Sequence, residues 1–294
     1  MEKLEDILTR FEKKITAGQN AQPQLPPDRY AVRDFFVADI LDWALKDDLH
    51  SMEHPLFSLS KKPQKGSEKG GALYYEHDGN HVTIKWGTDG RATIWDKDVL
   101  IYAVSQLMEA ANQGRPLSRT VRLTAYDLLK STQRHTGGKN YELLKEALAR
   151  LTGTRIETNI ATNGLRIHQG FGLLDNWKIV KRADSGQMIL VELTLNEWLY
   201  NAVLGREVLT LNRKYFQLDG GLERRLYELA RKHCGRQTEW TIGLPLLHSK
   251  SGSSAPLKKF RQHVKRLAEA NDLPDYLLSY DPDTDRVTFR LSVH

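Results

Sequence analysis

In the last third of the chain, apolar residues alternate between helical and extended spacing. The pattern predicts a helix, a short strand, two more helices and a two-stranded hairpin. In chain order, these elements are expected at residues 221–234, Glu239–Ile242, 243–249, 256–271, Tyr276–Tyr280 and Val287–Leu291. This order is typical of a winged helix-turn-helix, in which one helix enters the major groove of DNA and the others hold it in place.

The same order of elements is predicted upstream, although the two stretches share little sequence. Thr124 can cap a helix through its hydroxyl, and Thr162-Asn163-Gly164 is a strong hairpin signal. The elements are expected at 97–112, Thr120–Leu123, a helix beginning at Thr124, 139–152, Arg155–Ile160 and Leu165–Gly170. We therefore expect an α+β protein with two tandem winged-helix domains.

Further elements are predicted around the first of these units. They are a helix over 33–47, a hairpin of Val82–Lys85 with Ala92–Trp95, and a hairpin of Trp177–Val180 with Met188–Leu193. Thr194 and Glu197 have the spacing of a capping box, which would open a helix that ends at Leu204. These elements make the first domain the larger one.

The N-terminal end has a different pattern. Leu4, Leu8 and Phe11 fall at helical spacing and predict an amphipathic helix over 2–16. Residues 17–27 contain turn-forming residues and little to bury, which is typical of a flexible linker. We divide the chain into an N-terminal helical arm with its linker (1–30), a first winged-helix domain (31–205) and a second one (206–294).

The charge of the chain is concentrated in the second domain. The 294 residues carry a formal charge of +6 and a pI near 9.2. Residues 206–294 hold 16 Lys and Arg against 11 Asp and Glu, and residues 219–266 hold 11 against 4. A basic excess in one folded segment favours a polyanion as the partner, although a solvated basic surface explains it equally well.

The composition also indicates where the protein works. Cys234 is the single cysteine, so no intramolecular disulfide can form, which is typical of a reducing compartment. No stretch approaches the roughly 20 apolar residues that a membrane-spanning helix needs, and the N-terminus lacks an apolar signal core. We expect a cytoplasmic protein with no membrane contact.

The helix over 256–271 is the strongest candidate for a DNA-reading element. Its apolar residues share one side, and the remaining sides are rich in groups that bind DNA. These are Lys258, Lys259, Arg261, Gln262, Lys265 and Arg266, with His263 beside them. Arg and Gln can read base edges, whereas Lys suits phosphates. The alternative is a plain solvated face.

The first unit carries a more ambiguous set. In its third helix, acidic Glu142 and Glu146 alternate with candidate DNA-binding residues, so the two interpretations are evenly balanced. The candidates are Lys139, Asn140 and Lys145, together with Arg134 before the helix and Asn163 and Arg166 in the following hairpin. The hairpin around Thr158–Arg166 is interpreted as a DNA-contacting wing, a packing hairpin or a contact for a second protomer.

Several motifs resemble catalytic or metal sites but lack a necessary part. His50-Ser-Met-Glu-His54 matches an inverted zinc-peptidase motif, yet Pro55 ends the helix that the motif requires. Gly137-Gly-Lys-Asn140 lacks the upstream glycine and the Ser or Thr of a phosphate loop. Cys234 has no base positioned as its partner. We expect no catalytic residue, no metal, no cofactor and no enzymatic activity.

A cluster of arginines and lysines on the helix over 221–234 has two interpretations. Arg224, Arg225, Arg231 and Lys232 contact phosphates, or they pair with Glu228 and neighbouring acids. The sequence leaves both open.

Five segments of the chain resemble the replication initiator protein A family of broad-host-range plasmids. They are Lys46–Phe57, Thr93–Asp98, Gly138–Tyr141, Leu222–Gly235 and Leu257–Arg261. The resemblance extends from about residue 35 to residue 280, with the motifs in the same order. The N-terminal 30 residues lie outside it.

The resemblance implies a protein that binds direct repeats (iterons) at a plasmid origin and helps to open the duplex. It also implies contact with host replication factors such as the replicative helicase and the host initiator. A looser similarity to other tandem winged-helix initiators implies dimerisation through the first unit and iteron binding mainly through the second. Two other functions remain: a transcriptional regulator or autorepressor with this fold, and a metal-dependent nuclease.

Overall fold

The computed structural model describes residues 44–62 and 71–292, apart from positions 78, 162, 165, 182, 187 and 236. The predicted helix over 2–16, its linker and residues 33–43 lie outside this part of the chain. The described end of the helix predicted over 33–47 is instead strand β1 (Leu45–Asp48), which pairs with β9 (Val208–Leu211). The prediction was wrong for these residues because the spacing of apolar residues carries no information about a partner strand that is distant in sequence.

The first unit runs from α3 to β8 and has the predicted order of helix, strand, helix, helix and hairpin. Its elements are α3 (Lys97–Asn112), β4 (Thr120–Leu123), α4 (Ala125–Ser131), α5 (Gly138–Gly153), β7 (Asn176–Lys181) and β8 (Met188–Thr194). Thr124 caps α4 as predicted, because its side chain accepts a hydrogen bond from the backbone N–H of Asp127. β8 lies between β4 and β7 in an antiparallel sheet.

The hairpin that completes the first unit is not the expected one. Strands β5 (Arg155–Thr158) and β6 (Gln169–Gly172) form a hairpin, but β5 also pairs with β3 (Asn80–Trp86). Together with β2 (Gly71–His77) they form a separate sheet in the order β2-β3-β5-β6. The interpretation of Thr158–Arg166 as the wing of this unit was wrong, because long-range pairing assigns the hairpin to another sheet.

The predicted hairpin of Val82–Lys85 with Ala92–Trp95 was also wrong. The partners of β3 are β2 and β5, and residues 92–95 lead into α3 instead. There the backbone N–H of Thr93 donates to the carboxylate of Asp96 at 2.8 Å, and Thr93 makes an isolated β-bridge to Ser58. Ala92 and Ile94 are fully buried. A buried apolar turn therefore imitated the spacing of a strand.

Helix α6 (Glu197–Leu204) begins after Asn196, not at the capping box predicted from Thr194. The Asn196 side chain accepts a hydrogen bond from the Leu199 N–H at 2.8 Å and donates to the carbonyl oxygens of Gly172 and Leu173. Thr194 is the last residue of β8, where it pairs with Thr120. Strand β8 therefore includes Thr194, the residue that was predicted to cap the helix.

The second unit runs from α7 to β12 and repeats the predicted order. After the short 3-10 helix η2 (Arg213–Gln217), its elements are α7 (Gly221–His233), β10 (Glu239–Gly243), α8 (Leu244–Ser251), α9 (Leu257–Ala270), β11 (Tyr276–Asp281) and β12 (Arg286–Leu291). β12 lies between β10 and β11. In both units the first strand therefore pairs with the last one.

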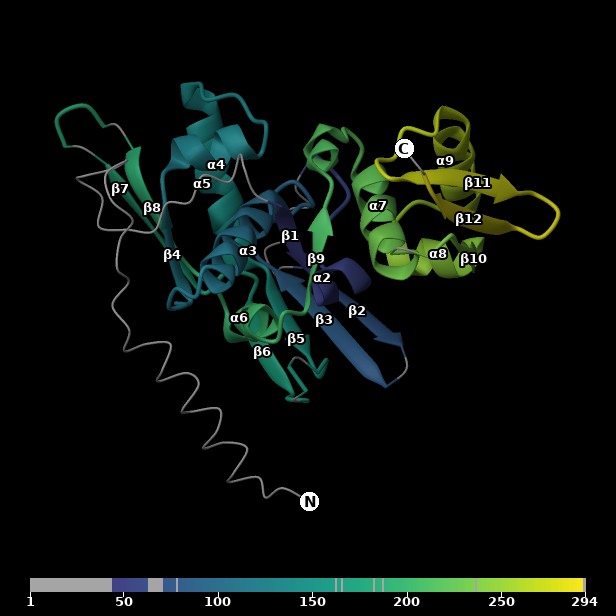
Figure 1. Cartoon of the computed structure of the whole chain (residues 1–294), viewed down its shortest axis with the longest axis horizontal. Helices are drawn as coiled ribbons and strands as arrows, with labels where there is room; N and C mark the ends of the chain where they lie inside the picture. The colour runs from purple at the N-terminus through teal and green to yellow at the C-terminus, as the bar shows by residue number, and fades with distance from the viewer. Residues whose placement is uncertain are drawn as a thin grey trace, which may run out of the picture.

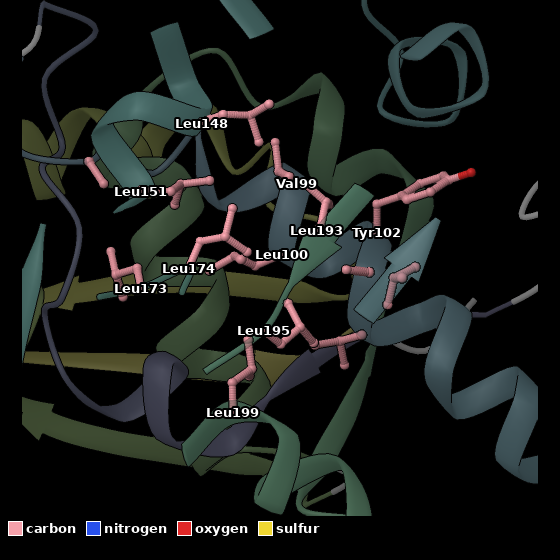
Figure 2. Packing of buried hydrophobic residues seen from close by; sticks show 14 of the residues in the cluster. Val99, Leu100, Tyr102, Leu148, Leu151, Leu173, Leu174, Leu193, Leu195 and Leu199 are labelled. Carbon is pink, nitrogen blue, oxygen red and sulfur yellow. The ribbon is translucent and has the colours of Figure 1, made fainter. Parts of the chain in front are cut away.

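Two apolar clusters form the cores of the molecule. The first joins α3, α5, β8 and α6, and Figure 2 shows its packing around Leu100, Leu148, Leu174 and Leu193. The second surrounds α7, α9 and the β10-β12-β11 sheet, which lie at one end of the long axis in Figure 1. Leu45 of β1 and Met52 of α2 (Leu49–Glu53) belong to this second cluster, so the division at residue 205 separates them from the core in which they pack.

Buried charges connect the two units. Lys97 of α3 is fully buried, and its ammonium lies 2.6 Å from a carboxylate oxygen of Asp47 and 2.9 Å from one of Glu228 on α7. Beside it, Asp98 and Arg224 form an ion pair at 2.7 Å. Burial alone would lower the pKa of Lys97, but Asp47 and Glu228 outweigh it and raise that pKa. The ammonium therefore stays charged, and α3 and α7 are fixed to each other.

Candidate DNA interface

Helix α9 has two faces of opposite character. Phe260 and Val264 are fully buried in the second core, and Leu257 and Leu267 pack beside them. The opposite face is exposed and basic. It consists of Lys258, Lys259, Gln262, His263, Lys265 and Arg266. The structure thus places all the residues predicted for this helix, except Arg261, on one exposed surface, which we call the α9 face.

Arg261 is engaged within the protein. Its guanidinium donates two hydrogen bonds to the carboxylate of Asp285, at 3.0 and 2.8 Å, and the Tyr280 hydroxyl donates to the same carboxylate at 2.7 Å. The hydrogen bond from Arg261 is the main reason that the pKa of Asp285 lies below its usual value. Arg261 therefore links α9 to the β11–β12 hairpin.

The remaining cations of the α9 face have few internal partners. Within the described part of the chain, Lys258, Lys259 and Arg266 form no ion pair with a carboxylate. The ammonium of Lys265 lies 5.2 Å from the centre of the Tyr280 ring, in a cation–π geometry that leaves its charge unpaired. These charges are available to the phosphates of a duplex.

The turn of the hairpin beside α9 is acidic, although β12 carries the exposed Arg286 and Arg290. Asp281 and Asp283 are exposed at its tip. Their carboxylates repel phosphates, so this tip is poorly suited to lie against a DNA backbone. The contrast makes α9 itself the part of the second unit that fits DNA best.

The corresponding helix of the first unit has a mixed surface. Lys139 and Lys145 are exposed on α5, and Asn140 is half-buried. Glu142 and Glu146 are exposed among them, as is Leu143, with 41% of its surface accessible. A helix face with equal numbers of exposed lysines and glutamates provides no net attraction for phosphates.

The other candidates of the first unit lie apart from α5 or have internal partners. Arg134 pairs with Asp98 at 2.9 Å and also donates to the Trp95 carbonyl oxygen. Arg166 donates to the side chain of Asn80 at 2.8 Å. Asn163 lies near the end of α6, where its backbone N–H donates to Glu207 at 2.9 Å. The structure therefore does not bring these residues together into one surface.

Two exposed cations in the first unit were missed from the sequence. Lys178 and Lys181 lie on β7, the strand next to β8, and both are exposed. They occupy the position in the first unit that β11 occupies in the second. The sequence did predict the hairpin of Trp177–Val180 with Met188–Leu193, which contains Lys178. Only the pairing of β8 with β4 shows that this hairpin belongs to the sheet of the first unit.

Of the two interpretations of the basic cluster on α7, the structure supports pairing with acids for Arg224 and Arg225. Arg224 pairs with Asp98, and Arg225 pairs with Glu228 at 3.1 Å. Both arginines are buried. Arg231 donates to the carbonyl oxygen of Thr210, and Lys232 donates to that of Leu49. The phosphate-contact interpretation of Arg224 and Arg225 is therefore wrong.

The residues of the zinc-like motif have separate partners. His50 lies 2.9 Å from Glu207, and Glu53 contacts His233, Lys232 and Lys250. Among the residues that the structure describes, no group of three His, Cys, Asp or Glu side chains could hold a metal ion.

Comparison with known proteins identifies the family. The model of the family described as "Replication initiator protein A" matches residues 46–278. This chain belongs to the replication initiator protein A family. A protein of Wigglesworthia glossinidia brevipalpis named "Putative replication protein" is 38% identical over 282 residues, which cover 95% of this chain and 97% of the relative. The resemblance seen in the sequence is thus confirmed, and with it a role in the initiation of replication.

The fold is similar to that of domains 2 and 3 of RctB, of which two crystal structures match. One has a TM-score of 0.57 and 12% identity, and covers 84% of this chain and 99% of that chain. The other has a TM-score of 0.53 and 13% identity, with coverages of 87% and 97%. At such low identity the similarity concerns the fold alone. It agrees with the predicted mixture of α and β structure.

In the part of the chain that the structure describes, no helix is long and apolar enough to cross a membrane.

Proposed function

We propose that this member of the family initiates plasmid replication by binding iterons in the double-stranded DNA of the origin. In this proposal both units are winged helices, and α9 is the helix that reads the DNA. The observation that carries it is the exposed cationic α9 face. This face belongs to a unit in which β10 pairs with β12, so that α9 is held between a helical core and a hairpin.

The residues of the α9 face divide the work by their chemistry. Lys258, Lys259 and Lys265 contact phosphates and supply most of the affinity, which makes binding sensitive to salt. Gln262 and Arg266 reach base edges and supply sequence preference. Arg261 orients the helix through Asp285 instead of contacting DNA directly.

The first unit has a supporting role. Lys139, Asn140 and Lys145 of α5, with Lys178 and Lys181 of β7, contact the neighbouring groove weakly. The mixed charge of the α5 surface also suits a protein partner. We propose that this unit mediates dimerisation.

Origin opening in this proposal requires no chemistry on the DNA and no metal or cofactor. Binding energy at the iterons bends the DNA and weakens a neighbouring AT-rich segment. The bound protein then contacts the host initiator and the replicative helicase. Both steps use protein surfaces and DNA deformation only.

The test is a footprint of the purified protein on the parental plasmid. We expect protection of directly repeated sequences beside an AT-rich tract, without cleavage of the DNA. Protection of a single palindrome over a promoter would instead favour a transcriptional regulator. Metal-dependent cleavage of the origin would contradict the proposal that the protein opens the duplex without chemistry on the DNA. The protected duplex provides the probe for the binding measurements below.

A further inference from the structure

The turn between α8 and α9 is in contact with the end of α2, which is distant in sequence. α8 ends at Ser251, and Gly252 follows in the left-handed conformation with a φ of 68°. A Cβ atom on Gly252 would lie 2.4 Å from the Cβ of Pro55, which lies two residues after the end of α2. Only glycine therefore allows the turn both this conformation and this approach.

Arg225 connects the same two segments with hydrogen bonds. Its guanidinium is buried on α7 and donates to the carbonyl oxygen of Met52 at 2.8 Å and to that of Glu53 at 2.9 Å. It also donates to the carbonyl oxygen of Lys250 at 2.8 Å. The last carbonyls of a helix have no partner within the helix. One side chain thus satisfies such carbonyls on both α2 and α8.

An ion pair adds a third connection. Glu53 of α2 pairs with Lys250 of α8 and, on its other side, with Lys232 and His233 of α7. Burial acts to raise the pKa of Glu53, but the hydrogen bonds with His233 and Lys250 outweigh it, so that pKa lies below the usual range. Glu53 is therefore charged under ordinary conditions, and the pair with Lys250 persists.

The turn itself can transmit a displacement to α9. Ser251 donates through its hydroxyl to the His248 carbonyl oxygen at 2.7 Å and accepts from the Ser253 N–H at 3.2 Å. The ring of His248 lies 2.8 Å from the carbonyl oxygen of Ala255, just before α9 begins. Hydrogen bonds thus connect the last turn of α8 with Ser253 and Ala255, close to the start of α9. A shift of about 1 Å in a recognition element is enough to weaken its contacts strongly.

We infer that Arg225, Glu53 and Lys250 are positioning residues that clamp the α8–α9 turn to α2 and so set how α9 meets DNA. We call these three residues the α2–α8 clamp. The inference rests on the proposed function, because it takes α9 as the DNA-reading helix. Since β1 and α2 precede the first unit in the chain, the clamp also couples DNA binding to the position of that segment.

The test compares two substitutions that each remove one cation from Glu53. Lys250→Met removes the clamp contact between α2 and α8, whereas Lys232→Met removes contacts between α2 and α7 and leaves the α8–α9 turn untouched. The two side chains are similarly buried, with 16% and 22% of their surface exposed. Lys232→Met is therefore the matched control for a general loss of stability or charge around Glu53.

Binding is measured by fluorescence anisotropy on the footprinted duplex over a range of salt concentrations. We expect Lys250→Met to weaken binding about tenfold, with an unchanged slope of log affinity against log salt, because the clamp contacts no phosphate. Lys232→Met should stay within about twofold of the wild type, since the turn keeps its connections to α2. Glu53→Gln should match Lys250→Met.

Hydrogen exchange of the DNA-free protein provides a second readout. We expect the amides of residues 251–255 and of Leu257 to exchange faster in Lys250→Met than in Lys232→Met, because only the first substitution loosens the turn. Equal affinity and equal exchange of the two variants would overturn the inference. A salt slope reduced by about one in Lys250→Met would also overturn it, because Lys250 would then be a phosphate contact.

A third variant separates this inference from the proposed function. The triple substitution Lys258→Ala, Lys265→Ala and Arg266→Ala removes α9 cations without touching the clamp. If the triple variant bound as tightly as the wild type, α9 would not be the reading helix and the proposed function would fail. If it lost binding while Lys250→Met behaved like Lys232→Met, the clamp alone would fail.

Discussion

Helices α5 and α9 occupy the same position in their two units but have different surfaces. Both bury an apolar stripe, which in α5 includes Leu144 and Leu148 and in α9 includes Phe260 and Val264. On the exposed side, α5 alternates lysine with glutamate, whereas the α9 face carries cations and Gln262 with a single acid, Glu269, at the far end of the helix. The same fold thus presents one surface suited to phosphates and one suited to a mixed or protein partner.

The two units present these surfaces in a fixed arrangement only if buried contacts hold them together. The buried pair of Asp98 with Arg224 joins them, so Arg224→Met leaves Asp98 with Arg134 as its one charged partner among the residues that the structure describes. We expect a loss of about 3–5 kcal/mol in unfolding free energy, because buried Asp98 loses one of its two cations and the carbonyl oxygens of Leu218 and Phe216 lose their donor. Urea denaturation followed by circular dichroism measures this. A loss below about 1 kcal/mol would show that the units are joined mainly by other contacts.

The strongest test of the comparison itself is the triple alanine variant of α9. We expect its affinity for the footprinted duplex to fall on the order of 100-fold at moderate salt, and the salt slope to decrease by about two to three. The matched double substitution on α5, Lys139→Ala with Lys145→Ala, should cost less than about tenfold. Anisotropy titrations at several salt concentrations measure both. Equal losses of DNA affinity from the α9 and α5 substitutions would show that the two helices contribute equally to binding.

The stability of the whole protein should also be sensitive to acid through the end of α2. Burial lowers the pKa of His54, which packs beside α7, to about 4 in the folded protein. Between pH 6.5 and pH 4 the unfolded chain binds a proton at this histidine and the folded chain does not, so stability falls as the pH decreases. We expect a loss of roughly 2 kcal/mol across this window.

His54→Asn removes the titrating group and is the control for the acid effect. Its unfolding free energy should decrease less over the same pH range than that of the wild type, as followed by denaturant titration at each pH. Parallel pH profiles for the two proteins would assign the acid sensitivity to other groups.

The smallest expected effect concerns the acids of α5. Glu142→Gln with Glu146→Gln removes two negative charges from the exposed side of α5. We expect an increase in DNA affinity of about two- to fivefold, with a steeper salt slope, because the two lysines then act without opposing charges. Unchanged affinity would show that α5 does not approach DNA and would favour a protein partner for this face.

Much of the fold followed from local patterns in the sequence. The helices α3, α5, α7 and α9 have apolar residues at helical spacing, and each lies within a few residues of its predicted position. The cationic α9 face followed for the same reason. Once Phe260 and Val264 are buried, the helical repeat determines that Lys258, Gln262 and Lys265 are exposed.

Only the tertiary structure decided what depends on contacts between distant segments. A strand carries no local record of its partner, so the sequence could not show that β8 pairs with β4 or that β1 pairs with β9. From the sequence, Arg224, Arg225 and Arg261 are candidates for DNA contact. Arg224 and Arg225 are instead buried and held by an acid or a carbonyl oxygen of another element, because a buried guanidinium is stable only where its charge and hydrogen bonds are satisfied. Arg261 is partly exposed, but its guanidinium pairs with Asp285 of the neighbouring hairpin. The helical repeat thus determined which residues face outward, and long-range pairing determined which charges remain free to bind.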